Sequence, residues 1–174
     1  MDAQNLGPDG AYCTRLLTPP DISRLQTLFD RSTDYFEIAT GAPPAKDEAA
    51  RAFVAGPPSK SVDEKRTVGV FDRSDELIGV LDAIVDWPDP GVWAMGMLLL
   101  EPASRGSGLG TAVLKAYETW AGGLGASQFR TAIVSHHERG RRFLEGRGYW
   151  CASTVDDYNA GAREATVLFY SKTA

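Results

Sequence analysis

The most constraining feature of the chain is a nearly apolar run, Val92–Leu100, that leads directly into a glycine-rich loop and then into a helix. A run this apolar is typical of a strand that is covered on both faces of a sheet. Residues 101–110 form the loop, and residues 111–121 carry apolar side chains at helical spacing. We therefore expect a buried strand, a loop and a helix that packs back onto the sheet.

A second strand pattern, Gln128–Val134, follows this helix, which Gly122 and Gly123 end. Two strands joined by one crossover helix lie parallel in the same sheet, whereas the shorter hairpins elsewhere are antiparallel. The other expected elements are strands at 12–17, 66–71, 77–85, 149–155 and 165–170, a helix capped by Thr18 and Asp21, a broken helical region at 35–54, and a helix at 135–147 that opens on a capping box of Ser135 and Glu138. The expected fold class is α/β (α+β), with a mixed, mostly antiparallel twisted sheet of about six to seven strands, a central parallel pair, and helices on both faces.

Length and composition indicate one domain. The 174 residues are 43% hydrophobic and 24% charged, which fits a single globular domain at 11–174 behind a loose N-terminal tail at 1–10. No apolar run approaches the roughly eighteen residues of a membrane span, and the first residues lack the pattern of a signal peptide, so we expect a cytoplasmic protein without a membrane partner. A net charge of −5 argues against nucleic acid as a partner. Cys13 and Cys151 are too few for a disulfide framework or a metal site, and we expect no metal.

The glycine loop predicts an anion site. Backbone N–H groups at a helix start point outward, and glycines without a Cβ let a phosphate approach them. A Walker loop would end in Gly-Lys-Ser/Thr, and a dinucleotide loop needs G-x-G-x-x-G, whereas Gly106, Gly108 and Gly110 alternate. The residues expected to hold a diphosphate are Arg105, Gly106, Ser107, Gly108, Leu109, Gly110 and Thr111.

Two segments, LLLEPASRGSGLGTAVLKAYETWA (98–121) and HERGRRFLEGRGY (137–149), resemble the GNAT superfamily of acetyl-coenzyme A-dependent N-acetyltransferases. The resemblance extends over about residues 12–170. It implies that the two parallel strands splay apart and that the pantetheine arm of acetyl-coenzyme A lies between them. Backbone groups of Leu98 and Leu100 would pair with the pantetheine, and an N–H near Leu98 or Leu99 would face the thioester oxygen. The implied activity is acetyl transfer to the amine of a small molecule, amino acid or peptide by direct attack, and a homodimer is possible.

The resemblance leaves the acid and the base open. The family's usual tyrosine acid is matched by Leu144, so Tyr149, Tyr158 and His137 are the candidate replacements. His137 stands where the family often has an asparagine, so it is also a candidate contact to the cofactor or the substrate. The family's usual glutamate base is missing, which leaves Asp82, Asp86 or a chain of water molecules.

The acceptor site is expected between the early helices, where Asp34, Tyr35 and Phe36 could hold a cation. The alternative is that the two aromatic side chains belong to the core. Arg139, Arg141, Arg142 and Arg147 either contact the cofactor's 3′-phosphate or form a solvated face. Two other functions stay open: a coenzyme A-binding regulatory module that has lost catalysis, and a nucleotide-binding module.

Overall fold

The computed structural model describes residues 4–6, 10–159, 161–162 and 164–174. They form an eight-stranded sheet in the order β1-β2-β3-β4-β5-β6-β8-β7. The strands are β1 (Gln4–Leu6), β2 (Tyr12–Leu16), β3 (Lys65–Phe71), β4 (Leu77–Ile84), β5 (Val92–Leu100), β6 (Gln128–Val134), β7 (Trp150–Asn159) and β8 (Glu164–Thr173). The α-helices are α1 (Ile22–Asp30), α2 (Thr33–Thr40), α3 (Glu48–Val54), α4 (Leu109–Gly123) and α5 (Glu138–Glu145).

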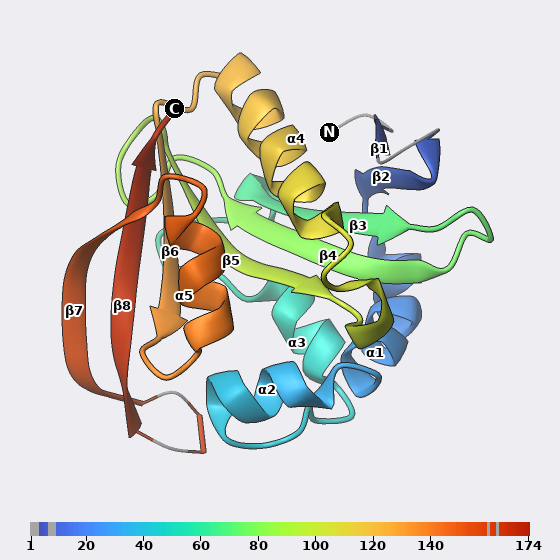
Figure 1. Cartoon of the computed structure of the whole chain (residues 1–174), viewed down its shortest axis with the longest axis horizontal. Coiled ribbons are helices and arrows are strands. Elements are labelled where there is room, and N and C mark those ends of the chain that lie inside the picture. The colour runs from blue at the N-terminus through green and yellow to red at the C-terminus, as the bar shows by residue number, and fades with distance from the viewer. Residues whose placement is uncertain (1–3, 7–9, 160, 163) are drawn as a thin grey trace.

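The topology confirms the expected mixed sheet. β5 and β6 are parallel, and every other pair of neighbouring strands is antiparallel (Figure 1). The sheet has one strand more than expected, because Gln4–Leu6 pairs with β2 although it lies in the segment expected to be a loose tail. Residues 1–3 and 7–9 of that tail lie outside the described residues.

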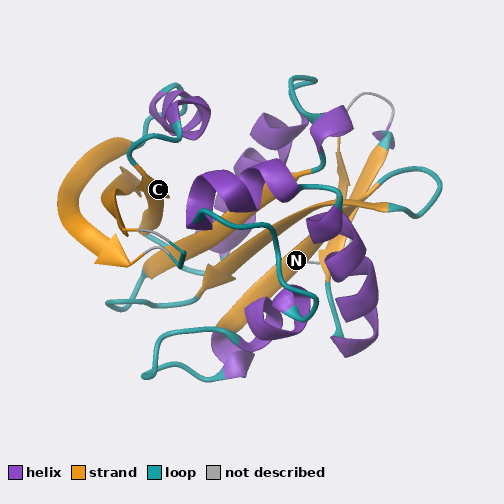
Figure 2. Ribbon diagram, turned by 90° about the horizontal axis from the view of Figure 1, so that it is seen from below, coloured by secondary structure: helices purple, strands orange, loops and turns teal. Residues whose placement is uncertain are grey.

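Helices cover both faces of the sheet, as Figure 2 shows from a second direction. One core contains Trp93, Leu114 and Tyr117 and lies between the sheet and the α4–α5 side. The other contains Phe29 and Leu99 and lies between the sheet and helices α1 to α3. The sheet therefore buries apolar side chains on both faces, which accounts for the apolar run in β5.

The break expected in the helical region at 35–54 is confirmed and lies at Gly41, whose φ of 84° is in the left-handed region and ends α2. The start of the last helix differs from the expectation. The capping box expected at Ser135 is wrong, because α5 begins at Glu138 with His137 as the preceding residue. The Glu138 carboxylate pairs with Arg142 (3.0 Å) instead of turning back to Ser135.

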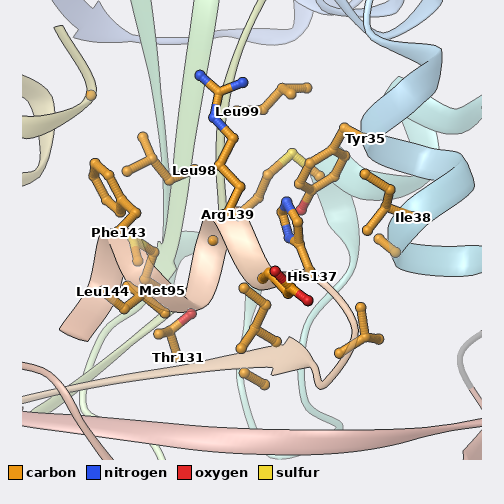
Figure 3. A pocket seen from close by; sticks show the side chains of 18 of the residues that line it. Tyr35, Ile38, Met95, Leu98, Leu99, Thr131, His137, Arg139, Phe143 and Leu144 are labelled. Carbon is orange, nitrogen blue, oxygen red and sulfur yellow. The ribbon is translucent and has the colours of Figure 1, made fainter. Parts of the chain in front are cut away.

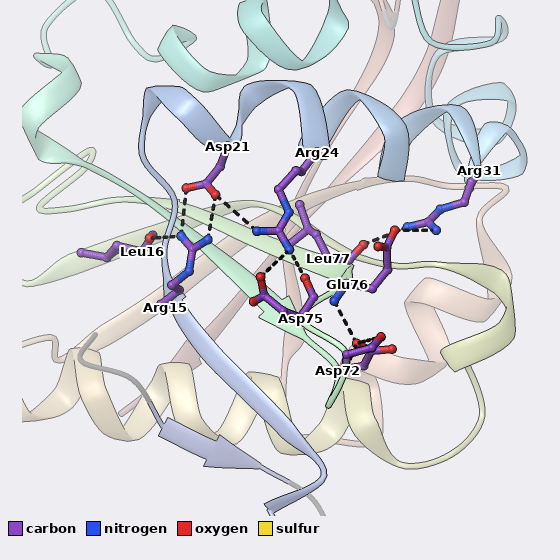
Figure 4. Close-up of polar contacts among 10 residues, drawn as sticks. Arg15, Leu16, Asp21, Arg24, Arg31, Asp72, Asp75, Glu76 and Leu77 are labelled. Atoms are coloured by element: carbon purple, nitrogen blue, oxygen red, sulfur yellow. Dashed lines mark hydrogen bonds and ion pairs between the residues drawn. The ribbon is translucent and has the colours of Figure 1, made fainter.

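The start of α1 is held by a buried carboxylate, as expected from its capping pattern. Asp21 accepts hydrogen bonds from the Thr18 backbone N–H (2.9 Å) and from two nitrogens of Arg15 (2.8 and 2.7 Å). Arg24 also approaches Asp21 and reaches on to Asp75, so this network connects α1 with β2 and with the β3–β4 turn (Figure 4). The network therefore anchors α1, which α2 follows in the chain, to β2 and to the β3–β4 turn.

We expect Asp21→Asn to lower the free energy of unfolding at pH 7 by about 2–3 kcal/mol, since it breaks a partly buried ion pair. The hydrogen bonds from Arg15 hold the pKa of Asp21 well below its ordinary value. This stabilisation is present above the unfolded-state pKa and is lost as the pH falls toward the folded-state pKa. Urea unfolding should therefore show the difference between the two proteins narrowing below about pH 4.

Asp63→Asn is the matched control, because Asp63 is exposed. This surface substitution should lower the free energy of unfolding by less than about 0.5 kcal/mol, both at pH 7 and below about pH 4. Equal stability of Asp21→Asn and the wild type at pH 7 would contradict the role given to Asp21.

Candidate active site

The parallel strands β5 and β6 pair only over the first part of their length. Their register runs from Val92 opposite Gln128 to Met95 opposite Thr131 and stops there. At the same place Gly96 forms a bulge, because Asp82 pairs with Met97 and the next residue of β4 pairs with Met95. The bulge turns the edge of β5 away from β6, so the expected splay is confirmed and its position is fixed.

A carboxylate packs directly behind the bulge. A Cβ added at Gly96 would lie 2.6 Å from Asp82 Oδ1, so any other residue would require the carboxylate to move. Asp82 is bound in turn by Lys65 Nζ (2.9 Å), which also donates to the carbonyls of Ala52 (2.6 Å) and Ala55 (2.8 Å). The Asp82 carboxylate, held by Lys65, therefore packs against Gly96 where β5 separates from β6.

Beyond the bulge, alternate residues of β5 present their backbone groups to the gap. Glu101 N–H donates to the Ile78 carbonyl (2.9 Å), which marks that pair as hydrogen-bonded to β4. Because hydrogen-bonded pairs alternate along an antiparallel ladder, the N–H and C=O groups of Leu98 and Leu100 face the β6 side. The Leu100 carbonyl agrees with this direction, since it accepts a bond from Arg105 Nε (2.7 Å).

A cavity of about 1220 Å³ occupies the gap between the strands. Its walls come from α2, from β5 at Met95–Leu100, from β6 beginning at Thr131, from the glycine loop and from α5. In Figure 3 the side chains of Tyr35 and Ile38 project from α2 toward the side of His137. The cavity therefore joins the start of α4 to the bulge in a single space.

The glycine loop is open to this cavity. Gly106 and Gly108 have φ values of 81° and 87°, and an added Cβ would meet no atom within 4 Å at either position. Gly108 is the residue before α4, and within the described chain no backbone or side-chain acceptor binds the N–H groups of Gly106, Gly108 or Gly110. Gly110 also lets α4 approach α5, because its Cβ would lie 3.3 Å from the Phe143 ring. These unpaired N–H groups are the kind of donors that an anion binds at a helix start.

Two arginines flank the glycine loop, one expected there and one whose role the sequence left open. Arg105 donates to both carboxylate oxygens of Asp34, one of them at 3.1 Å, so it is not a free positive charge. That bond is the main cause that lowers the pKa of Asp34. Arg147 donates to Thr111 Oγ1 (3.1 Å from Nε) and stacks 3.9 Å from the Phe143 ring centroid. Arg147 therefore supplies positive charge at the start of α4.

His137 and Tyr35 meet at the inner part of the cavity. Their ring centroids lie 6.5 Å apart. Burial lowers the pKa of the His137 imidazole, and His136 and Arg105 lower it further. Burial also raises the pKa of the Tyr35 hydroxyl, with a contribution from Asp82. The imidazole is therefore neutral near pH 7 and the phenol stays protonated.

A family model described as the acetyltransferase (GNAT) family matches residues 25–149. The chain belongs to this GNAT acetyltransferase family. Comparison with curated proteins finds no sequence match.

Solved structures of GNAT acetyltransferases share the fold. An acetyltransferase from Thermus thermophilus is 22% identical with a TM-score of 0.74, over 94% of this chain and 97% of that one. A spermidine N-acetyltransferase from Vibrio cholerae, solved with CoA and spermine, is 13% identical with a TM-score of 0.74 over 95% and 96%. Arabidopsis thaliana NAA60, solved with a bisubstrate analogue, is 15% identical with a TM-score of 0.71 over 94% and 99%.

Several residues predicted for the GNAT site lie elsewhere. Asp86, with a φ of 52°, binds Gly91 N–H (2.8 Å) in the turn before β5. Tyr149 is buried and donates to Glu118 (2.9 Å), and Phe36 is in the core, 4.9 Å from the Phe29 ring. None of these three lines the cavity, and neither does Asp82. For Asp82 and Phe36 the physical reason is that strand and helix alternation predicts a face, but not which part of that face the cavity reaches. Asp86 lies beyond the end of β4, and Tyr149 is held by Glu118.

Two loop residues do not line the cavity with their side chains. Leu109 is buried in the core, and Ser107 Oγ donates to the Ser104 carbonyl (3.0 Å) and accepts from the Leu109 N–H (3.4 Å) within the loop. Leu144, which matches the family's tyrosine, is buried at the cavity wall and carries no proton to donate. Tyr158 lines the cavity from β7, so it keeps its place among the candidate acids.

Sequence reasoning missed Ile38 and left the role of Arg147 open. Ile38 lies three residues after Tyr35, so helical spacing puts the two on one face of α2 and could have indicated it. Arg147 is 36 residues from Thr111, and no local pattern connects them.

No described helix has both the length and the apolar composition to cross a membrane. Among the described residues, no group of three or more His, Cys, Asp or Glu is placed to hold a metal ion.

Proposed function

We propose that this GNAT chain transfers the acetyl group of acetyl-coenzyme A to a primary amine of a small molecule, an amino acid or a peptide, in the cytoplasm. One observation carries the proposal: a single cavity connects unpaired N–H groups at a helix start with an unpaired strand edge and a neutral histidine. A ligand that fills it needs a diphosphate at one end and an extended amide-containing arm at the other. Coenzyme A has both.

The residues present fit this ligand. The N–H groups of Gly106, Gly108 and Gly110 and the guanidinium of Arg147 would hold the diphosphate. Leu98 and Leu100 would pair with the arm as a neighbouring strand does. Acetyl-coenzyme A supplies an activated acyl group as a thioester. The Leu98 N–H, rather than that of Leu99, faces the gap and would bind the thioester oxygen as it gains negative charge.

His137 is the proposed acceptor of the proton that the substrate amine must lose. An alkylammonium has a pKa of about 10 and must lose a proton before it can attack a carbonyl carbon. His137 lines the cavity and is neutral near pH 7, so it would accept that proton. A thiol pKa of about 8.5 lets coenzyme A leave as the thiolate, so Leu144 in place of a tyrosine does not abolish the reaction.

The apolar Leu144 also supports a second candidate, a coenzyme A-binding regulatory module with weak or no catalysis. Both candidates need the same cofactor site, and they differ only in turnover.

The test has two steps. Acetyl-coenzyme A at about 100 times its Kd should stabilise the folded protein by about 2.7 kcal/mol and raise the melting temperature, whereas ATP and NAD should not. A thiol-release assay with a panel of primary amines should then exceed the hydrolysis background. Binding without release for any amine would support the regulatory module instead. Equal shifts with ATP would contradict the cofactor assignment itself.

A further inference from the structure

The charge of the cavity wall favours an anion over a cation. The charged side chains that line it are four arginines and two carboxylates, namely Arg105, Arg139, Arg142, Arg147, Asp34 and Glu138. Asp34 is bound by Arg105, and Glu138 is bound by Arg142 at 3.0 Å. Within the described part of the chain, each lining carboxylate therefore already has an arginine partner, and the Glu138–Arg142 pair is 73% and 75% exposed.

Helix α2 crosses the cavity from the glycine loop to the β7–β8 hairpin. Its first turn is attached to the loop through Asp34 and Arg105. Its last residue, Thr40, accepts a hydrogen bond from Ala162 N–H (2.8 Å) beyond the end of β7. In Figure 1, α2 accordingly lies between α1 and the β7–β8 hairpin. The cavity thus has a phosphate end at the loop and a distal end at the hairpin.

The distal end is lined by apolar and neutral polar side chains, and carries no charged side chain among the described residues. The side chains that line it are those of Ile38, Ala39, Thr40, Val134, Tyr158, Asn159 and Val167. His136 also lines this end, but its Nε2 lies 2.9 Å from the Ile38 carbonyl oxygen and is engaged there. A second ammonium group placed against the buried side chains of Val134 and Val167 would lose hydration there without a counter-ion, which is costly.

We infer, resting on the proposed function, that the acceptor is a monoamine with an apolar body, and that polyamines are poor acceptors. The Vibrio cholerae spermidine N-acetyltransferase shares the fold at 13% identity, so the likeness does not carry its acceptor over to this chain. The reacting amine would lie near His137, and the apolar body would extend along the lining side chains of Ile38 and Val134. The distal end would therefore discriminate against a second ammonium group, because the described residues there offer no counter-ion.

The test compares two amines that differ only in one terminal charge. With saturating acetyl-coenzyme A, the kcat/KM for n-pentylamine should exceed that for 1,5-diaminopentane at least tenfold in a thiol-release assay. Equal values, or a preference for the diamine, would overturn the inference while leaving acetyl transfer established. No release with these or other primary amines, with acetyl-coenzyme A still bound, would instead refute the proposed function and this inference with it.

A charge placed in the distal end should reverse the preference. Ile38→Asp should raise the diamine-to-monoamine ratio of kcat/KM at least tenfold. Ala39→Asp serves the same purpose should Ile38→Asp fail to fold, which a melting curve reports. Thr33→Asp adds the same charge at an exposed position of α2 outside the cavity and should leave the ratio unchanged. A ratio that stays constant in folded Ile38→Asp and Ala39→Asp would place the acceptor elsewhere.

Discussion

Replacing Gly108 by aspartate is expected to weaken acetyl-coenzyme A binding at least 100-fold, which corresponds to about 2.7 kcal/mol. Gly108 has a φ of 87° and its N–H is one of the unpaired donors in front of α4. A carboxylate at this place repels the diphosphate and competes for the same N–H groups. The fold should persist, because an added Cβ would meet no atom within 4 Å and aspartate tolerates the left-handed region. Isothermal titration calorimetry measures the affinity, and circular dichroism checks the fold.

Gly122→Asp provides the matched control. It introduces the same side chain into α4, also with no atom within 4 Å of the added Cβ, but near the far end of the helix. Its affinity for acetyl-coenzyme A should stay within about twofold of the wild type, because the helix dipole acts only over the terminal turn. If Gly108→Asp bound as tightly as Gly122→Asp, the diphosphate would lie elsewhere and the proposed cofactor site would be wrong.

His137→Gln is expected to lower kcat about 100-fold at neutral pH, the lower end of what a positioned general base contributes. Glutamine can form hydrogen bonds but cannot accept the proton of an ammonium group. In the wild type, kcat/KM should fall below a pH that lies under the ordinary imidazole pKa of about 6.5, because burial lowers the pKa of His137. Above that pH the imidazole is neutral and the rate should level off. In the variant this break should be missing.

Tyr149→Phe separates the histidine from a competing candidate. It removes a hydroxyl that is bound to Glu118 outside the cavity, so both kcat and the break in the pH profile should remain. A pH profile that is the same in His137→Gln and the wild type would show that the acceptor binds as the free amine and that His137 is not the base.

The fold could be predicted to a large extent because its determinants are local. The apolar run of β5, the crossover helix and the spacing of the hairpin strands each leave a periodic pattern in the chain. The bulge at Gly96 leaves no such pattern, since a single glycine in an apolar strand is compatible with a regular ladder. It became visible only through the pairing of Asp82 with Met97 on one side and the loss of pairing after Thr131 on the other.

The candidate site divides in the same way. The glycine loop could be located from the sequence, because an anion site at a helix start is built from neighbouring backbone groups. The sequence could name candidate acid–base and acceptor residues, but it could not show which of them are already engaged, because that depends on partners far along the chain. Asp82 is occupied by Lys65, Asp34 by Arg105, and Tyr149 by Glu118.

The sequence alone determined where the chain turns, which strands are buried and where a phosphate group can approach the backbone, since these follow from side-chain size and spacing over a few residues. The tertiary structure alone decided which charges remain free, because an ion pair between distant residues forms only when the fold brings them together. Asp34 shows the difference: beside Tyr35 in the sequence it suggests a cation site, and in the folded chain Arg105 neutralises it.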